Sequence, residues 1–320
     1  MRYAFQAESL VKRFGKTTAL DRLDLAARPG TVLGVLGPNG AGKTTAIRVL
    51  ATLLRPDQGR ATVAGFDVVR QAAQVRRMIG LTGQYASVDE DLTGLENLVL
   101  IGRLLDLRRG EAVARARQLL TDFELTEAGS RKVATYSGGM RRRLDLAASL
   151  VGRPSVVFLD EPTTGLDPGK REEVWRMIRR MTAGGGAVLL TTQYLEEADA
   201  LADEISVIDH GRVIAHGTQA ELRRLAGGQT IAVRPVAQDR LGEVATIISE
   251  VTGRRPDAAG GGVMTVPVEG DAAFIEAVRR LAAAEVEVAE VSLRLPSLDE
   301  VFVTLTGRHT DAYESKGDAT

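Results

Sequence analysis

"TVLGVLGPNGAGKT", residues 31–44, is the stretch that decides the fold of this chain. Its first half is an apolar run that predicts a buried strand, and its last residues begin a helix. Between them, "GPNGAGKT" (37–44) matches the phosphate-loop pattern G-x-x-x-x-G-K-[ST]. Because the motif lies between a strand and a helix, it favours a nucleotide site over an ordinary glycine-rich turn.

The residue types of this loop explain why it should hold phosphate. Gly37, Gly40 and Gly42 let the backbone curl so that its amides point inward at phosphate oxygens. The following helix adds its positive N-terminus. Lys43 is expected to reach the β- and γ-phosphates, and Thr44 to place its hydroxyl on Mg²⁺.

A second strand end supplies carboxylates. "SVVFLD" (155–160) is strongly strand-like and ends in Asp160, which is expected to serve the metal. Side chains alternate along a strand, so the adjacent Glu161 points elsewhere and is a candidate to orient and deprotonate the attacking water. With "AVLLTT" (187–192) as a third such strand among helical patterns, the chain is expected to be α/β with a mostly parallel sheet.

Composition narrows the class of protein. The chain has 320 residues, of which 44% are hydrophobic and 26% charged, with a formal net charge of -1, so no nucleic-acid partner is expected. The absence of cysteine excludes disulfides and thiolate chemistry. His210, His216 and His309 are too few and too clustered to indicate a metal site. No stretch approaches a membrane helix, and the first residues do not resemble a signal peptide.

Two domains are expected from the length and pattern. The first spans residues 1–225, with a mainly helical part at about 85–150 that includes one helix with a clear apolar face: Met140, Leu144, Ala147, Ala148 and Val151. "RLAGGQT" (224–230) marks a boundary, and residues 229–308 predict a small α/β domain. In that domain a helix is expected near 271–284, with Phe274, Val278, Leu281 and Ala282 on one face. Residues 309–320 are polar and are expected to be disordered.

A phosphate loop with Asp160 also suits kinases and GTPases, but "YSGGMRRRLDLAASLV" (136–151) points elsewhere. It resembles the signature motif L-S-G-G-Q of ATP-binding cassette (ABC) ATPases. The resemblance implies a P-loop NTPase fold of the ABC type, with a RecA-like core and a helical subdomain. It also implies that Ser137, Gly138 and Gly139 meet ATP held by another copy of the chain in a head-to-tail homodimer. Tyr136 and Met140 depart from the usual Leu and Gln.

Other motifs of the family follow in order. Phe14 matches the aromatic that stacks on adenine, Gln84 the glutamine that senses Mg²⁺ and nucleotide, and "TTGLDP" (163–168) the D-loop, whose Asp167 crosses the dimer interface. The resemblance assigns Mg²⁺ to Thr44 and, through water, to Gln84 and Asp160. It makes Glu161, Gln193 and Lys43 catalytic. The nucleotide-binding residues that it implies are Phe14, Gly37, Asn39, Gly40, Gly42, Lys43, Thr44, Thr45, Gln84 and Asp160.

"VLLTTQYLEEAD" (188–199) falls at the switch region, where most of the family has histidine. Gln193 stands at that position. Its amide can donate a hydrogen bond to the γ-phosphate but cannot titrate. Gln193 is therefore interpreted as a neutral γ-phosphate sensor, which leaves Glu161 as the only base.

This glutamine variant, together with "RLPSLDEVFVTLTG" (294–307), is similar to the ATP-binding subunits of actinobacterial daunorubicin-resistance-type exporters. The resemblance implies ATP-driven efflux of a drug-like or lipid-like substrate through one or two separate permease subunits, for antibiotic resistance or secretion. It also implies a peripheral location on the cytoplasmic face of the plasma membrane. In the C-terminal motif Leu298, Val301, Phe302 and Leu305 share a helical face, for which packing onto the cassette is favoured over drug contact.

Several alternatives stay open. A non-transport ABC ATPase acting on ribosomes or nucleic acid is the main one, although the single phosphate loop, the lack of heptads and the lack of a basic arm oppose it. Import rather than export is a second. The segment after Gln84 suits a permease-docking groove or an ordinary surface. Arg141, Arg142 and Arg143 suit a solvated helix face or a dimer contact.

Overall fold

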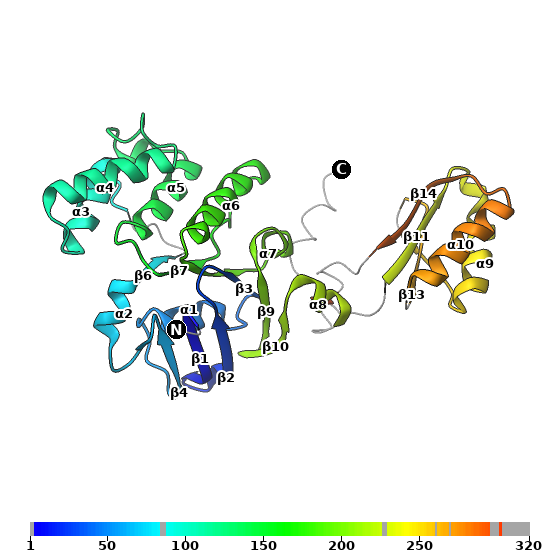
Figure 1. The fold of residues 1–320 in the computed structure, drawn as a ribbon, viewed down its shortest axis with the longest axis horizontal. Coiled ribbons are helices and arrows are strands. Elements are labelled where there is room, and N and C mark those ends of the chain that lie inside the picture. The colour runs from blue at the N-terminus through cyan, green and yellow to red at the C-terminus, as the bar shows by residue number, and fades with distance from the viewer. Residues whose placement is uncertain are drawn as a thin grey trace. The chain divides into compact units, whose positions relative to one another are not determined.

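The computed structural model describes residues 3–83, 88–225, 229–259, 261–268, 270–294 and 301–302. The chain divides into two compact units, and the division falls between Thr218 and Gln219 (Figure 1). We describe each unit by itself. No helix in the described ranges is both long and apolar enough to cross a bilayer.

The first unit is built on a six-stranded sheet of order β10-β9-β3-β8-β7-β6. All neighbouring pairs are parallel except β10 with β9. Three central strands, β3, β7 and β8, are buried along their whole length, as expected of parallel strands covered on both faces. The prediction of a mostly parallel α/β sheet is confirmed. The strands are β3 (Val32–Leu36), β6 (Ile79–Thr82), β7 (Val156–Asp160), β8 (Ala187–Thr192), β9 (Glu204–Asp209) and β10 (Arg212–Gly217).

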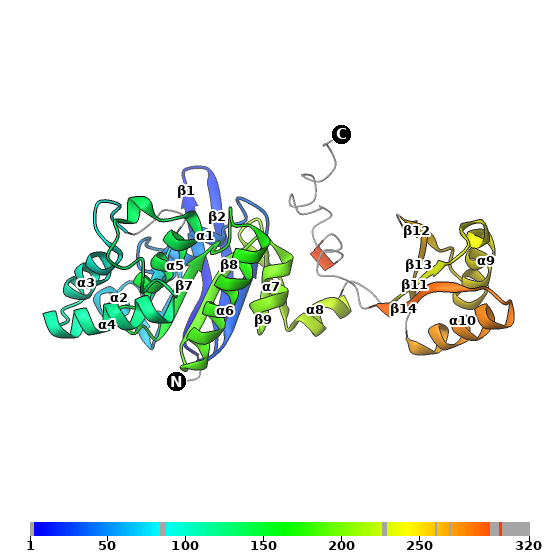
Figure 2. The same cartoon turned by 90° about the horizontal axis from the view of Figure 1, so that it is seen from above.

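Helices of this unit fall into two groups (Figures 1 and 2). One group accompanies the large sheet: α1 (Lys43–Leu50), α2 (Ala72–Met78), α6 (Pro168–Ala183) and α7 (Leu195–Leu201). The other group lies together at one end of the unit: α3 (Gly94–Leu104), α4 (Arg109–Asp122), the 3₁₀ turn η1 (Val133–Thr135) and α5 (Gly138–Ser149). On α5, Leu144, Ala147 and Ala148 are buried and Met140 packs against the same core, which confirms the predicted apolar face up to the end of the helix; Val151 is also buried but lies beyond Ser149, where α5 ends.

The N-terminal part of the chain forms most of a second sheet, which was not predicted. It is antiparallel, in the order β2-β1-β4-β5. Its core joins that of the large sheet, and the rings of Phe5 and Phe158 meet edge to face at 5.9 Å. The strands are β1 (Phe5–Phe14), β2 (Thr17–Ala27), β4 (Gln58–Val63) and β5 (Phe66–Asp67).

The second unit is a small antiparallel sheet of order β12-β13-β11-β14 with two helices packed against it. After α8, the strands and α-helices follow in the order strand, helix, two strands, helix, strand, a split βαβ arrangement. On α10 the buried residues are Ala277 and Leu281, and Phe274 packs against the same core, whereas Val278 and Ala282 are exposed, so the predicted face matches the buried face only in part. Its elements are α8 (Gln219–Leu225), β11 (Gln229–Pro235), η2 (Gln238–Arg240), α9 (Leu241–Thr252), β12 (Asp257–Ala259), β13 (Val263–Val268), α10 (Asp271–Ala283) and β14 (Val288–Arg294).

Two residues of the C-terminal motif belong to the described part. Val301 and Phe302 are helical, and each is 1% exposed. Leu298 and Leu305, which were predicted to share their face, lie outside the described residues, as do residues 309–320.

Candidate active site

The phosphate loop joins the end of β3 to the start of α1 and needs glycine for steric reasons. Gly42 caps α1 with φ 107°, a left-handed conformation that disfavours other residues. A Cβ at Gly42 would lie 2.5 Å from the carbonyl oxygen of Ala19 on β2. A Cβ at Gly37 would lie 2.3 Å from the carbonyl oxygen of Ile208. The loop is therefore tightly packed between neighbouring strands as well as sharply curved.

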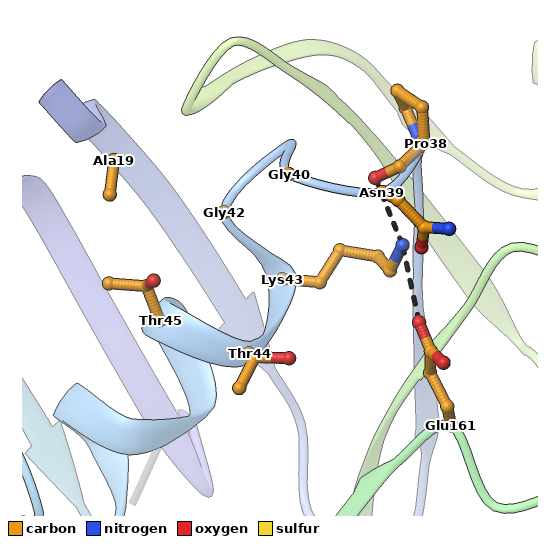
Figure 3. A pocket seen from close by; sticks show the side chains of 9 residues that line it. All are labelled: Ala19, Pro38, Asn39, Gly40, Gly42, Lys43, Thr44, Thr45 and Glu161. Atoms are coloured by element: carbon orange, nitrogen blue, oxygen red, sulfur yellow. Dashed lines mark hydrogen bonds and ion pairs between the residues drawn. The ribbon is translucent and has the colours of Figure 1, made fainter. Parts of the chain in front are cut away.

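This loop borders a cavity of about 180 Å³ (Figure 3). Most of the lining comes from the predicted nucleotide-binding stretch, and Glu161 closes one side. Ala19 of β2 lies on the far side of the loop from Glu161 (Figure 3). The lining residues are Ala19, Pro38, Asn39, Gly40, Gly42, Lys43, Thr44, Thr45 and Glu161.

Lys43 is the cation of the site. Its side chain is 4% exposed, and its Nζ donates to the carbonyl oxygens of Gly37 at 2.6 Å and Pro38 at 3.1 Å. Glu161 Oε1 lies 3.6 Å from the same nitrogen. Burial lowers the pKa of Lys43, and the negative charges of Glu161 and Asp160 oppose that shift. The ammonium thus stands where phosphate oxygens can replace its present oxygen partners.

Asp160 joins the phosphate loop to strand β8. Its Oδ1 accepts hydrogen bonds from Thr44 Oγ1 at 3.2 Å and from Thr191 Oγ1 at 2.6 Å. The carboxylate is 4% exposed and lies at the C-terminal end of β7. A buried carboxylate beside a threonine hydroxyl offers the oxygen ligands that Mg²⁺ prefers.

Glu161 turns back toward the loop because its backbone is left-handed. Its φ is 50°, which is uncommon outside glycine and costs of order 1–3 kcal/mol. The strand end β8 fixes this conformation, since Glu161 N donates to both the carbonyl oxygen and the Oγ1 of Thr191, each at 3.1 Å. Thr164 Oγ1 donates to the carboxylate at 3.3 Å. The carboxylate is therefore held at the cavity instead of following the strand direction.

Gln193 follows directly after β8, and the register of the sheet places it beside the phosphate loop. Thr192 pairs with Leu36 of β3, and Gly37 N donates to the carbonyl oxygen of Thr192 at 3.4 Å. Gln193 is half-buried at the next position. The sheet order thus brings the predicted switch residue between the strand that carries the loop and the strand that carries Asp160.

The signature residues begin helix α5 and do not line this cavity. Ser137 is the N-cap, and its Oγ accepts from Met140 N at 3.3 Å. No atom lies within 4 Å of a Cβ built at Gly138, whereas one at Gly139 would lie 3.0 Å from Lys170 Cδ. The N-terminus of α5 is therefore open on one side and meets the D-loop helix α6 on the other.

Asp167 caps helix α6 within its own chain. Its Oδ1 accepts from Lys170 N at 3.0 Å, and its Oδ2 pairs with Lys170 Nζ at 2.5 Å. These hydrogen bonds lower the pKa of the Asp167 carboxyl. Asp167 is about half exposed, so it remains open to a further partner.

Both departures from the usual signature have a structural reason. Tyr136 is 5% exposed, and its hydroxyl donates to the carbonyl oxygen of Ala128 at 2.7 Å. It packs so closely on α3 that a Cβ at Gly94 would lie 2.4 Å from Tyr136 Oη. Met140 uses its backbone to bond Ser137 and packs its side chain into the core of the helical group.

Phe14 ends β1 and does not line the cavity. It is 49% exposed, an unusual position for a phenylalanine, and Lys12 Nζ lies 5.6 Å from its ring centroid. An exposed ring is free to stack on a planar ligand, and the stacking of Phe14 on adenine stays a prediction. Gln84 lies outside the described residues.

Two contributors were not predicted. Thr191 bonds both Asp160 and Glu161, and Ala19 lines the cavity from β2. The hydroxyl of Thr191 gave a signal in the sequence, because a polar residue within a buried strand requires a partner. Nothing in the sequence marks Ala19 as a site residue, because its position depends on how the antiparallel sheet packs against the loop.

Comparison with known proteins gives a consistent result. The ABC transporter family profile matches residues 20–164. The chain is 53% identical to the daunorubicin resistance ATP-binding protein DrrA2 of Streptomyces coeruleorubidus over 98% of each chain. It is 48% identical to the doxorubicin resistance ATP-binding protein DrrA of Mycobacterium tuberculosis (strain ATCC 25618 / H37Rv), over 94% of this chain and 91% of that protein. It is 33% identical to the linearmycin resistance ATP-binding protein LnrL of Bacillus subtilis (strain 168), over 95% and 98%.

Solved structures agree on the fold. An ATP-binding subunit of an ABC transporter superposes with a TM-score of 0.63 at 27% identity, covering 69% of this chain and 92% of that one. The ADP conformation of an ATP-binding cassette also gives a TM-score of 0.63, at 26% identity, covering 69% and 93%.

Proposed function

This chain belongs to the ABC transporter family as one of its ATP-binding subunits, and from that premise we propose that it powers the export of a drug-like or lipid-like molecule. Members of this family bind ATP and hydrolyse it, and this chain is such an ATPase. The relatives that match it over nearly their full length are named for resistance to daunorubicin, doxorubicin and linearmycin.

The observation that carries the proposal is the convergence of three groups on one cavity. Lys43 and Glu161 line the cavity, and Asp160 accepts a hydrogen bond from Thr44, which also lines it. In the proposed reaction Lys43 holds the terminal phosphates, Glu161 orients and deprotonates water, and the amide of Gln193 donates to the γ-phosphate. Since glutamine does not titrate, Glu161 acts as the only base.

The residues present fit Mg²⁺. Asp160 offers a buried carboxylate, and Thr44 Oγ1 lies 3.2 Å from its Oδ1, so both oxygens can face one cation. We assign the metal to Thr44 and, through water, to Asp160 and Gln84. When bound, Mg²⁺ neutralises charge on the phosphates.

A second copy of the chain is required to complete the site. Ser137, Gly138 and Gly139 begin α5 but lie away from the cavity of their own chain. Backbone amides at a helix N-terminus attract phosphate, and the proposed head-to-tail dimer lets these residues meet ATP held by the partner. Asp167 would cross the same interface, and Phe14 would stack on adenine.

Export requires a membrane component. We propose one or two separate permease subunits, to which dimers of this chain attach at the cytoplasmic face of the plasma membrane. Residues 1–225 form the ATP-binding domain in this proposal, and residues 229–308 a small C-terminal domain. ATP-driven closure of the dimer then moves the permease, and hydrolysis reopens it.

Two variants test this function. Lys43→Ala should lose ATP binding and hydrolysis together, because no other buried cation faces the phosphates among the residues lining the cavity. Glu161→Gln should bind ATP but hydrolyse it at least about a hundredfold more slowly and accumulate as an ATP-dependent dimer. The dimer is measured by size-exclusion chromatography with light scattering. A Glu161→Gln protein that turns over ATP at the wild-type rate would overturn the assignment of the base.

A further inference from the structure

The basic run on helix α5 contains one arginine that differs from its neighbours. Arg141 pairs with Glu90 at 2.7 Å, and Arg143 lies 3.5 Å from Glu124, both acidic groups more than half exposed. Arg142 is 14% exposed and Arg143 18%, so burial does not set Arg142 apart; its partners do, because they are main-chain oxygens of other segments and not an exposed carboxylate. The expectation of a solvated face or dimer contact therefore does not hold for Arg142.

The guanidinium of Arg142 donates hydrogen bonds to main-chain oxygens of two other segments. Its Nε donates to the carbonyl oxygen of Pro162 at 2.6 Å, and its Nη2 to that of Glu161 at 3.4 Å. Its Nη1 donates to the carbonyl oxygen of Gly83 at 3.2 Å. Asp145, one turn along α5, lies 3.5 Å from Nη1 and balances the charge.

These contacts connect the signature helix α5 to the segments that carry Glu161 and Gln84, the residues to which roles in hydrolysis are assigned above. Helix α5 starts at the signature serine, Ser137, and Arg142 lies in its second turn. Glu161 carries the candidate base, and Gly83 directly precedes Gln84 in the sequence. One side chain thus spans the segment that meets the partner's ATP and the segments that serve the chain's own ATP.

We propose that Arg142 is a positioning residue for hydrolysis, which holds the backbone of Glu161 and Gly83 against the signature helix. The inference rests on the proposed function, because it uses the roles given there to Glu161 and Ser137. Glu161 already has a left-handed backbone, fixed on one side by Thr191 through its amide. Arg142 fixes the other side of the same residue through its carbonyl oxygen.

The chemistry of arginine is essential to this role. A planar guanidinium presents five donors in a fixed fork and can hold several carbonyl oxygens at once. Lysine offers one nitrogen on a flexible stem, so Arg142→Lys keeps the charge beside Asp145 but cannot span both segments. A role limited to charge balance predicts rescue by lysine, and a positioning role predicts none.

The test compares Arg142→Gln and Arg142→Lys with Arg143→Gln and Arg143→Lys in the full chain. For both Arg142 variants we expect kcat for ATP to fall about 10- to 100-fold, because small misplacements of catalytic groups have effects of this size. We expect KM and the ATP dissociation constant to stay within about threefold. The Arg143 variants should stay within about twofold of wild type in kcat. A wild-type kcat in either Arg142 variant, or a loss of ATP affinity as large as the loss of kcat, overturns the proposal.

Hydrogen–deuterium exchange gives a readout that does not depend on hydrolysis. In Arg142→Gln, the hydrogen-bonded amides of Glu161, Thr164 and Leu166 should exchange at least about tenfold faster than in wild type, with no such change in Arg143→Gln. Unchanged exchange in that segment would refute the positioning role. A wild-type protein that fails to hydrolyse ATP would instead contradict the proposed function, while the exchange experiment still decides whether Arg142 fixes the Glu161 segment.

Discussion

Glu197 is a buried carboxyl that the proposed reaction does not use, and we predict that Glu197→Gln stabilises the first unit at neutral pH. Glu197 lies on α7 and is 1% exposed. Within the described residues neither carboxylate oxygen has a partner of full hydrogen-bond geometry, although Thr192, Thr163 and Trp175 bring donors near. Burial raises the pKa of Glu197, and those donors and the charge of Arg142 only partly oppose the shift.

The sign of the pH dependence follows from this shift. Above pH 4.5, the ordinary value for this carboxyl, the unfolded chain releases the proton while the folded chain retains it up to a higher pH. In that window the folded state holds the extra proton, so the free energy of unfolding falls as the pH rises. Above the pKa that Glu197 has in the folded state, the full free-energy cost of burying its negative charge is present. Glu197→Gln removes it, and its benefit should vanish near pH 4.

We take the expected gain in the free energy of unfolding from the replacement of buried ion pairs by neutral residues, which stabilises proteins by about 1–4 kcal/mol when no countercharge is left unpaired. Arg142 is not stranded, because it keeps Asp145 and three carbonyl oxygens. For a unit of this size, each kcal/mol corresponds to roughly 2–4 °C in melting temperature. We therefore expect the variant to melt several degrees higher at pH 8 and at the wild-type temperature near pH 4.

Urea unfolding followed by tryptophan fluorescence measures the stability of the first unit, which contains Glu197. Trp175 is the only tryptophan of the chain and lies on α6, so its signal reports the first unit alone. Glu196→Gln, at the exposed neighbouring position, is the matched control and should change stability by less than about 0.5 kcal/mol. A Glu197→Gln protein that is less stable than wild type at pH 8 would refute the reasoning, since Glu197 would then stabilise the fold through its charge.

Three further predictions concern the nucleotide site. The pH–rate profile of the wild type should lack a step near pH ~6.5 assignable to position 193, and Gln193→His should introduce one; a step that disappears in Gln193→Ala would contradict this. Gly42→Ala should abolish ATP binding in a fluorescent-nucleotide assay, because its Cβ would lie 2.5 Å from Ala19 O. Gly40→Ala should weaken binding less, because its Cβ would meet no atom within 4 Å and only the strain of its φ of 81° remains. Phe14→Ala should raise KM for ATP about tenfold without changing kcat, as lost base stacking predicts; an unchanged KM would exclude stacking.

The strands of the large sheet could be predicted, and those of the N-terminal sheet could not. Parallel strands covered on both faces are continuous apolar runs, as in residues 31–37 and 155–160. Strands β1 and β2 lack a regular alternation because bulges shift their register, with left-handed residues at Ser9 and Arg22. A shift of one residue exchanges the two faces of a strand, so a pattern search with a fixed period misses it.

At the site, motif spacing predicted which residues meet but not which neighbours hold them. Lys43, Thr44, Asp160 and Glu161 come together as expected, because the ends of β3 and β7 share one edge of the sheet. Three successive arginines on a helix point in three directions about 100° apart. Only the packing of α5 decides that Arg142 is the one that reaches the main-chain oxygens of Glu161 and Pro162.

The residues of strand β8 that hold the site together are different from the residue that is proposed to contact the nucleotide. The hydroxyl of Thr191 bonds Asp160 and Glu161, and that of Thr192 accepts from Tyr194 N at 2.9 Å. Position 193 comes immediately after these two residues, and a substitution there leaves both sets of bonds in place. The residue at the proposed switch position can therefore be a titrating imidazole or a neutral amide without a change in the hydrogen bonds of the strand that precedes it.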